Sequence, residues 1–134
     1  MFLPCQALIV SSDRLHCVKI KEIAARLGMQ SVQCASLTDA RTRIAEQSFQ
    51  LVLCGHDLPD CNVRTALRVL TSLTGDLPVI VHSHLADWDA CMRALGAGAF
   101  DYIACPPLTR LRRNASCDSL LRFSVSRRIS QSAA

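Results

Sequence analysis

Four short runs of consecutive apolar residues recur along the first 104 residues. They are Ala7–Val10, Leu51–Cys54, Val79–Val81 and Tyr102–Ala104. Each run is continuous rather than alternating, which is the pattern of a strand covered on both faces in a parallel sheet. A fifth run, Ser31–Cys34, alternates and is typical of an edge strand. The pattern therefore predicts five strands, four of them central or well covered.

The segments between these runs carry apolar residues at spacings of three and four, which predicts helices. Gly28 ends the first helix as a C-cap, and Ser36 followed by Asp39 begins the second in the manner of a capping box. The apolar positions that define the helices are Ile20, Ile23, Ala24 and Leu27; Ala40 and Ile44; Val63, Ala66, Leu67 and Leu70; and Cys91, Met92 and Leu95.

Strand and helix alternate five times, which predicts right-handed crossovers and a doubly wound α/β sheet of five parallel strands. In such folds ligands bind outside the carboxyl ends of the strands. Residues 1–129 are predicted to form a single domain, with a last helix that begins at Ser116, and residues 130–134 a frayed tail.

The formal net charge of the 134-residue chain is +4, and it is unevenly distributed. From Thr109 onward there are six arginines and one aspartate, whereas residues 1–108 hold nine basic and ten acidic side chains. The basicity thus belongs to a predicted loop over 107–116 and to the last helix. No apolar run approaches the roughly 20 residues of a membrane helix, and the N-terminus lacks the features of a leader peptide, so we expect a cytoplasmic protein.

Eight cysteines would indicate a disulfide framework in a small secreted chain. None of them forms a C-x-x-C pair, and most lie inside apolar patterns, where a free thiol packs as a small hydrophobic group. We predict reduced core cysteines.

Two stretches resemble one known family. The ten residues 51–60, which end in Asp57-Leu58-Pro59-Asp60, resemble the third strand and following loop of receiver domains from bacterial response regulators. Residues 98–106 are similar to the Gly-Ala-x-Asp-Tyr-Leu-x-Lys-Pro segment of the same family. The resemblance covers residues 6–106 and implies a flavodoxin-like receiver fold with strand order 2-1-3-4-5, in a two-component or phosphorelay pathway.

The resemblance also implies where phosphorylation chemistry would lie. The family transfers a phosphoryl group to an aspartate after the third strand, with Mg²⁺ held by that aspartate and by an acidic pair after the first strand. The phosphoacceptor position is Gly55, and the acidic-pair positions are Ser11 and Ser12. The lysine that pairs with the phosphoryl group is replaced by Cys105. All four chemical positions are therefore changed.

Only accessory positions of the family are retained: Ser83 after the fourth strand, Tyr102 in the fifth, and Asp13 beside the acidic pair. The sequence therefore predicts a degenerate receiver that is not an enzyme, needs no cofactor or metal, and signals independently of phosphorylation. Receiver domains bind partners through the fourth helix, fifth strand and fifth helix, so we expect a protein partner or a homodimer there. Trp88, at the start of the fourth helix, is either part of the buried stripe or an anchor of that face.

Several alternatives use the same region. In the first, Asp57 or Asp60 serves as a displaced phosphoacceptor. In the second, a zinc site is formed by His56, His84, Asp13 and Cys105, although their spacing is not typical of one. The former phosphorylation pocket would act as a ligand or redox sensor lined by Asp13, His56, His84 and Cys105, with Arg110, Arg112 and Arg113 as contacts for an anion or a partner. A DNA-associated role through the arginine-rich segment is less well supported, because no helix-turn-helix follows the body and only 4% of residues are aromatic.

Overall fold

The structure is a computed structural model that describes residues 5–56, 58–74, 77–83 and 88–104. Strands and helices alternate along this part of the chain. They are β1 (Cys5–Val10), α1 (Arg14–Arg26), β2 (Met29–Cys34), α2 (Leu37–Glu46), β3 (Leu51–Gly55), α3 (Val63–Thr74), β4 (Val79–Ser83), α4 (Trp88–Gly96) and β5 (Asp101–Ala104). No helix within these residues is long and apolar enough to cross a membrane.

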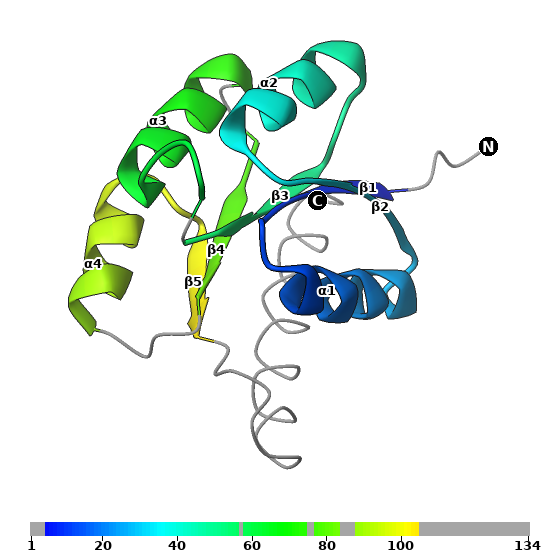
Figure 1. Ribbon diagram of the computed structural model, residues 1–134, viewed down its shortest axis with the longest axis horizontal. Coiled ribbons are helices and arrows are strands. Elements are labelled where there is room, and N and C mark those ends of the chain that lie inside the picture. The colour runs from blue at the N-terminus through cyan, green and yellow to red at the C-terminus, as the bar shows by residue number, and fades with distance from the viewer. Residues whose placement is uncertain (1–4, 57, 75–76, 84–87, 105–134) are drawn as a thin grey trace, which may run out of the picture.

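The five strands form one parallel sheet in the order β2-β1-β3-β4-β5 (Figure 1). The predicted fold class and strand order are thus confirmed, and β2 lies at an edge as its alternating pattern indicates. In the register, Val10 pairs with Cys54 and Gly55 pairs with His82. The carboxyl ends of β1, β3 and β4 therefore meet at one edge of the sheet, where this class of fold places its site.

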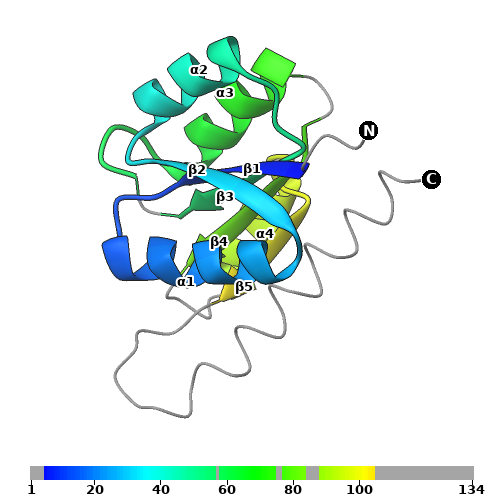
Figure 2. The ribbon, with the colours of Figure 1, turned by 90° about the vertical axis from the view of Figure 1, so that its right-hand side faces the viewer.

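Two hydrophobic layers cover the two faces of the sheet. Residues 51 and 53 of β3 pack with α1, whereas residues 52 and 54 pack on the opposite side with α2, α3 and α4. Figure 2 shows α1 on one side of the sheet and α2 and α3 on the other. Every residue of β3 and β4 is buried, which explains why their sequences are apolar without alternation.

Two of the predicted helix boundaries have visible causes. Ser36 is the N-cap of α2, and its side-chain oxygen accepts a hydrogen bond from the backbone N–H of Asp39 at 3.2 Å. Gly28 follows α1 with a φ of +80°, a left-handed conformation that side chains rarely adopt. These local signals fix where the chain enters and leaves the sheet.

The buried face of α4 differs from the prediction. Ala90 and Ala94 are the residues that pack inward, whereas Met92 and Leu95 are 48% and 39% exposed. Trp88 is 73% exposed, so the interpretation that placed it in the core is wrong. The small alanines let α4 lie close to the sheet, and the larger apolar side chains then point outward.

Three cysteines of the described residues are buried free thiols: Cys17, Cys34 and Cys54. Burial raises the pKa of Cys54 to about 12, and burial together with the nearby Asp39 raises that of Cys34 to about 11. These thiols stay protonated at neutral pH and pack as small apolar groups. The prediction that cysteines pack in the core is confirmed for them.

Candidate functional site

The phosphoacceptor position lies at the buried end of β3. A Cβ atom at Gly55 would be 3.2 Å from Oγ of Ser11 and 3.4 Å from both Cβ of Ser11 and the carbonyl oxygen of Val10. A side chain there would require its neighbours to move by a few tenths of an ångström. The end of β1 has thus closed against Gly55 on the α1 side of the sheet.

Ser11 is 5% exposed, and its polar groups are satisfied within the fold. Its N–H donates to the carbonyl oxygen of Cys34 at 2.9 Å, and its Oγ accepts from the N–H of Asp13 at 3.2 Å. Its carbonyl oxygen accepts from the thiol of Cys17 at 3.5 Å. Ser11 therefore ties β1 to β2 and α1 and presents no charge to a ligand.

The residues at this edge do not fit the magnesium ion that the family binds. Mg²⁺ needs oxygen ligands that include carboxylates, and positions 11, 12 and 55 supply two neutral serines and a glycine. Asp13 is half-buried, and its backbone carbonyl begins α1 by accepting from the N–H of Cys17 at 3.0 Å. Within the described residues, no group of three or more His, Cys, Asp or Glu side chains could hold a metal ion.

Two of the accessory positions, Ser83 and Tyr102, lie on the neighbouring strands β4 and β5. Ser83 is buried at the end of β4, and Tyr102 is half-buried on β5. The Tyr102 ring meets the His56 ring edge-on, with 6.3 Å between their centroids. His56 follows Gly55 and donates its N–H to the carbonyl oxygen of His82 at 2.8 Å.

Several predicted site residues lie outside the described part of the chain. They are Asp57, His84, Cys105, Arg110, Arg112 and Arg113, together with the basic loop over 107–116, the helix predicted after it and the tail over 130–134. The zinc, redox and arginine-loop hypotheses depend on these residues and stay predictions.

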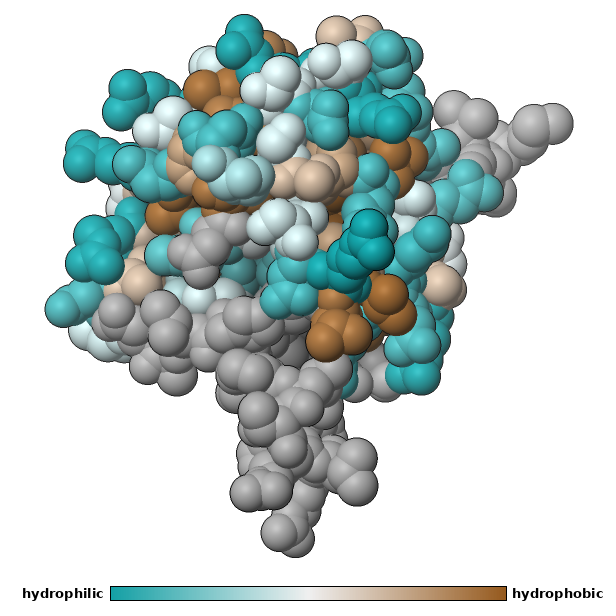
Figure 3. All heavy atoms as spheres, viewed as in Figure 1, coloured by the Kyte–Doolittle hydropathy of each residue, from teal (hydrophilic) through white to brown (hydrophobic). Residues whose placement is uncertain are grey.

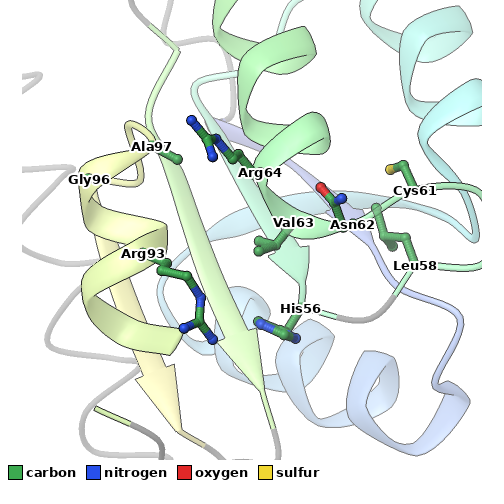
Figure 4. Close-up of a pocket in the computed structure, with 9 residues that line it drawn as sticks. All are labelled: His56, Leu58, Cys61, Asn62, Val63, Arg64, Arg93, Gly96 and Ala97. Atoms are coloured by element: carbon green, nitrogen blue, oxygen red, sulfur yellow. The ribbon is translucent and has the colours of Figure 1, made fainter. Parts of the chain in front are cut away.

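A cavity of about 770 Å³ lies between α3, α4 and the loop after β3 (Figure 4). Its lining residues are His56, Leu58, Cys61, Asn62, Val63, Arg64, Arg93, Gly96 and Ala97. Of the described residues that the sequence placed at the former phosphorylation pocket, His56 lines this cavity, whereas Asp13 is not among its described lining residues. The alternation along β3 explains the difference, because a side chain at position 55 faces α1 and the next one faces α3 and α4.

Sequence reasoning missed the two arginines of this cavity. Arg64 and Arg93 belong to different helices and form no motif. One signal was present, because α3 carries an arginine and no acid in its first turn, against the usual preference of a helix N-terminus.

Asp60 has a structural role in the loop after β3. One carboxylate oxygen accepts from the N–H of Leu37 at 3.1 Å, and the other accepts from the N–H and hydroxyl of Thr38 at 3.1 and 3.0 Å. The carboxylate therefore caps the N-terminus of α2 from a distant loop. The hydrogen bond from Leu37 is the main cause that lowers the pKa of Asp60 below its usual range.

Replacing Asp60 by asparagine is expected to lower the melting temperature at pH 7. Because the pKa of Asp60 is lower in the folded than in the unfolded chain, its ionised form stabilises the fold at neutral pH. That contribution is lost as the pH falls through the lowered pKa, below the ordinary carboxyl value of about 3.9. Thermal unfolding followed by circular dichroism should show a difference that shrinks in this acidic range.

Asp39→Asn is the matched control. Asp39 lies in the first turn of α2, the turn that Asp60 caps, but its carboxylate accepts no hydrogen bond from the described residues. Its effect should be smaller. A deficit in Asp60→Asn that grows on acidification would contradict the capping role.

The alternating sheet, its loops and the motifs at its carboxyl edge define a receiver-type signalling domain. The family model "Response regulator receiver domain" matches residues 7–114. The chain belongs to this family, whose members act in two-component signalling.

Two curated relatives are the transcriptional regulatory protein ZraR of Salmonella typhimurium and the regulatory protein VanRB of Enterococcus faecalis. They are 26% and 28% identical over 99 residues, which is 74% of this chain. The matched part spans 22% of ZraR and 44% of VanRB, so each relative is much longer than the part it shares.

Solved structures share the fold. A putative response regulator from Chloroflexus aurantiacus superposes with a TM-score of 0.81 at 22% identity, covering 96% of this chain and 99% of that one. A CheY-like receiver domain protein from Methanospirillum hungatei gives a TM-score of 0.78 at 22% identity, covering 98% of each chain.

Proposed function

We propose that this chain is a receiver-type signalling domain that works without aspartyl phosphorylation and acts by docking to another protein molecule. The observation that carries the proposal is Gly55, a residue without a side chain that is closed against the neutral Ser11. The domain would be a binding module and not an enzyme.

Phosphoryl transfer to this family requires a carboxylate to accept the group and a cation to neutralise its charge. Gly55 supplies no carboxylate, and the residues at positions 11 and 12 cannot replace an acidic pair as ligands for Mg²⁺. Asp60, an alternative acceptor, already caps α2 with both carboxylate oxygens. Among the residues that the structure describes, the phosphoacceptor and metal-ligand roles therefore have either no group to perform them or one that is engaged elsewhere.

The outer side of α4 supports docking as the output. Trp88, Met92 and Leu95 follow one another at spacings of four and three, so they form an apolar stripe along one side of the helix. An exposed stripe that contains tryptophan is typical of an interaction surface. We propose a second copy of the chain as its occupant, because two copies related by a two-fold axis would each cover the other's stripe.

A second apolar surface competes with this one. Leu15 and Val18 on α1 are 68% and 58% exposed, and Figure 3 shows hydrophobic side chains gathered over α1. These two residues lack an aromatic anchor, which is why we favour α4. A substitution on α1 therefore serves as the matched control for one on α4.

Beryllofluoride with Mg²⁺ is expected to leave the ¹⁵N–¹H spectrum of this protein unchanged. Beryllofluoride mimics the phosphoryl group only where a carboxylate and a bound cation hold it, and this edge offers neither at the family's positions. A receiver domain that retains the aspartate serves as the positive control in the same buffer. Saturable shifts of the Gly55 and Ser83 amides would overturn phosphorylation independence.

A further inference from the structure

The cavity between α3 and α4 has the dimensions of a ligand site. Its volume of about 770 Å³ lies within the range of roughly 300–1,000 Å³ that small-molecule pockets occupy. It opens beside the carboxyl end of β3, which is the edge where doubly wound folds bind ligands. Nothing in the proposed docking function uses it.

The charged groups among the described lining residues favour a negative ligand. Arg64 and Arg93 line the cavity together with His56, and no acidic side chain is among the nine lining residues that the structure describes. Neither guanidinium group forms an ion pair or hydrogen bond with another residue of the described part of the chain. Figure 4 shows the Arg93 and His56 side chains pointing toward one another from α4 and from the end of β3. An anion between these groups would offset the positive charge of the guanidinium.

The start of α3 adds to this positive potential. Asn62 caps the helix by accepting from the N–H of Thr65 at 2.9 Å, and both Asn62 and Val63 line the cavity. The first N–H groups of a helix have no acceptor within it, and the helix dipole places positive charge at this end. Arg64 raises that charge further, although an acid would be the stabilising residue there.

The rest of the lining is apolar and suits an organic body. Leu58 is buried, and Val63 and Ala97 are half-buried at the wall. We propose that this cavity binds a small organic anion, with its carboxylate or phosphate group held by Arg93 beside His56 and its apolar body against Leu58, Val63 and Ala97.

This site is separate from the former phosphorylation centre. A side chain at position 55 faces the α1 layer, whereas the cavity lies in the layer of α3 and α4. His56 connects the cavity to β5, because its ring meets that of Tyr102 at 6.3 Å. A bound anion that moves His56 would therefore be felt at Tyr102, next to the α4 side of the domain.

The test is a ¹⁵N–¹H titration of the full chain with benzoate, phenyl phosphate and benzamide. The first two probes carry the carboxylate and the phosphate on the same ring, and benzamide replaces the carboxylate by a neutral amide. Both anions should give saturable shifts at His56, Asn62, Arg64 and Ala97, with an affinity at least about tenfold above that of benzamide, because a charge-assisted contact is lost in the amide.

Arg93→Gln should weaken benzoate binding by at least about tenfold, and Arg64→Gln should weaken it less, because the Arg64 guanidinium lies at the other end of the cavity. Arg68→Gln is the matched control, since Arg68 is an exposed arginine of α3 that does not line the cavity. All three side chains are exposed, so the variants should keep the dispersed spectrum of the folded protein.

Three results would overturn the proposal: equal affinity for benzoate and benzamide, an equal loss in Arg68→Gln, or no saturable shift with either anion up to about 10 mM. The outcome is independent of the beryllofluoride experiment, which probes the α1 side of the sheet. If anion binding in the cavity were disproved, phosphorylation independence would be unaffected, and the reverse also holds.

Discussion

Replacing Gly55 by aspartate is expected to lower the free energy of unfolding by about 2–4 kcal/mol at pH 7. The new Cβ would lie 3.2 Å from Oγ of Ser11 and 3.4 Å from the carbonyl oxygen of Val10. The carboxylate would then be buried beside oxygen atoms and without the acidic pair and cation that accompany it in the family. Urea unfolding followed by far-UV circular dichroism measures the loss.

Two further substitutions separate the charge from the space. Gly55→Ala adds only the Cβ and should stay within about 1 kcal/mol of the native protein, because Ser11 can shift slightly and alanine loses less backbone entropy on folding than glycine does. Gly55→Asn adds nearly the same volume as aspartate without its charge and should fall between the two.

The difference between the Asp and Asn variants should depend on pH. Burial raises the pKa of an aspartate in the folded state above its unfolded value, so the carboxylate destabilises the fold at pH 7. This penalty shrinks as the pH falls through the raised pKa and disappears below the ordinary aspartate pKa of about 3.9, where the carboxyl is protonated in both states. An aspartate variant as stable as the alanine variant at pH 7 would show that the charge finds a partner and that the site is less closed than Gly55 and Ser11 indicate.

The strands of the sheet were predictable from the sequence because the apolar pattern of each segment matches its burial in the fold. Continuous apolar runs such as Leu51–Cys54 can be covered only between two helical layers, and Ser36 caps the helix that it begins. The order of the strands required more than pattern, and it came from the family motifs in residues 51–60 and 98–106.

The candidate site was predictable only where the motif fixes the position. Gly55 and Ser11 follow from the motif, but their mutual closure depends on the packing of β1 against β3. The cap of α2 by Asp60 joins residues more than twenty positions apart, and no local rule links them. The cavity arginines are likewise brought together only by the packing of α3 beside α4.

The fourth helix shows why spacing alone can choose the wrong face. Two stripes satisfy the helical period, one containing Ala90 and Ala94 and the other containing Trp88, Met92 and Leu95. Hydrophobicity favours the larger side chains, but close approach of a helix to a sheet favours the small ones. The outward stripe then needs a different explanation, which the docking proposal provides.

Trp88→Ala is expected to weaken self-association of the protein at least about thirtyfold, the effect of losing a tryptophan anchor worth about 2 kcal/mol. Trp88 is 73% exposed, so the substitution should change the free energy of unfolding by no more than about 0.5 kcal/mol. Sedimentation over a series of protein concentrations measures the first quantity. Urea unfolding by circular dichroism measures the second and does not depend on the tryptophan that is removed.

Leu15→Ala decides which apolar surface is responsible, because Leu15 is comparably exposed but lies on α1. If the α4 stripe is the interface, this variant should associate like the native chain. The reverse pattern, with Leu15→Ala dissociated and Trp88→Ala unaffected, would transfer the interface to α1. A native protein that sediments as a monomer at every concentration would exclude a second copy as the occupant of the α4 stripe. A self-complementary stripe would pair with its copy at high protein concentration.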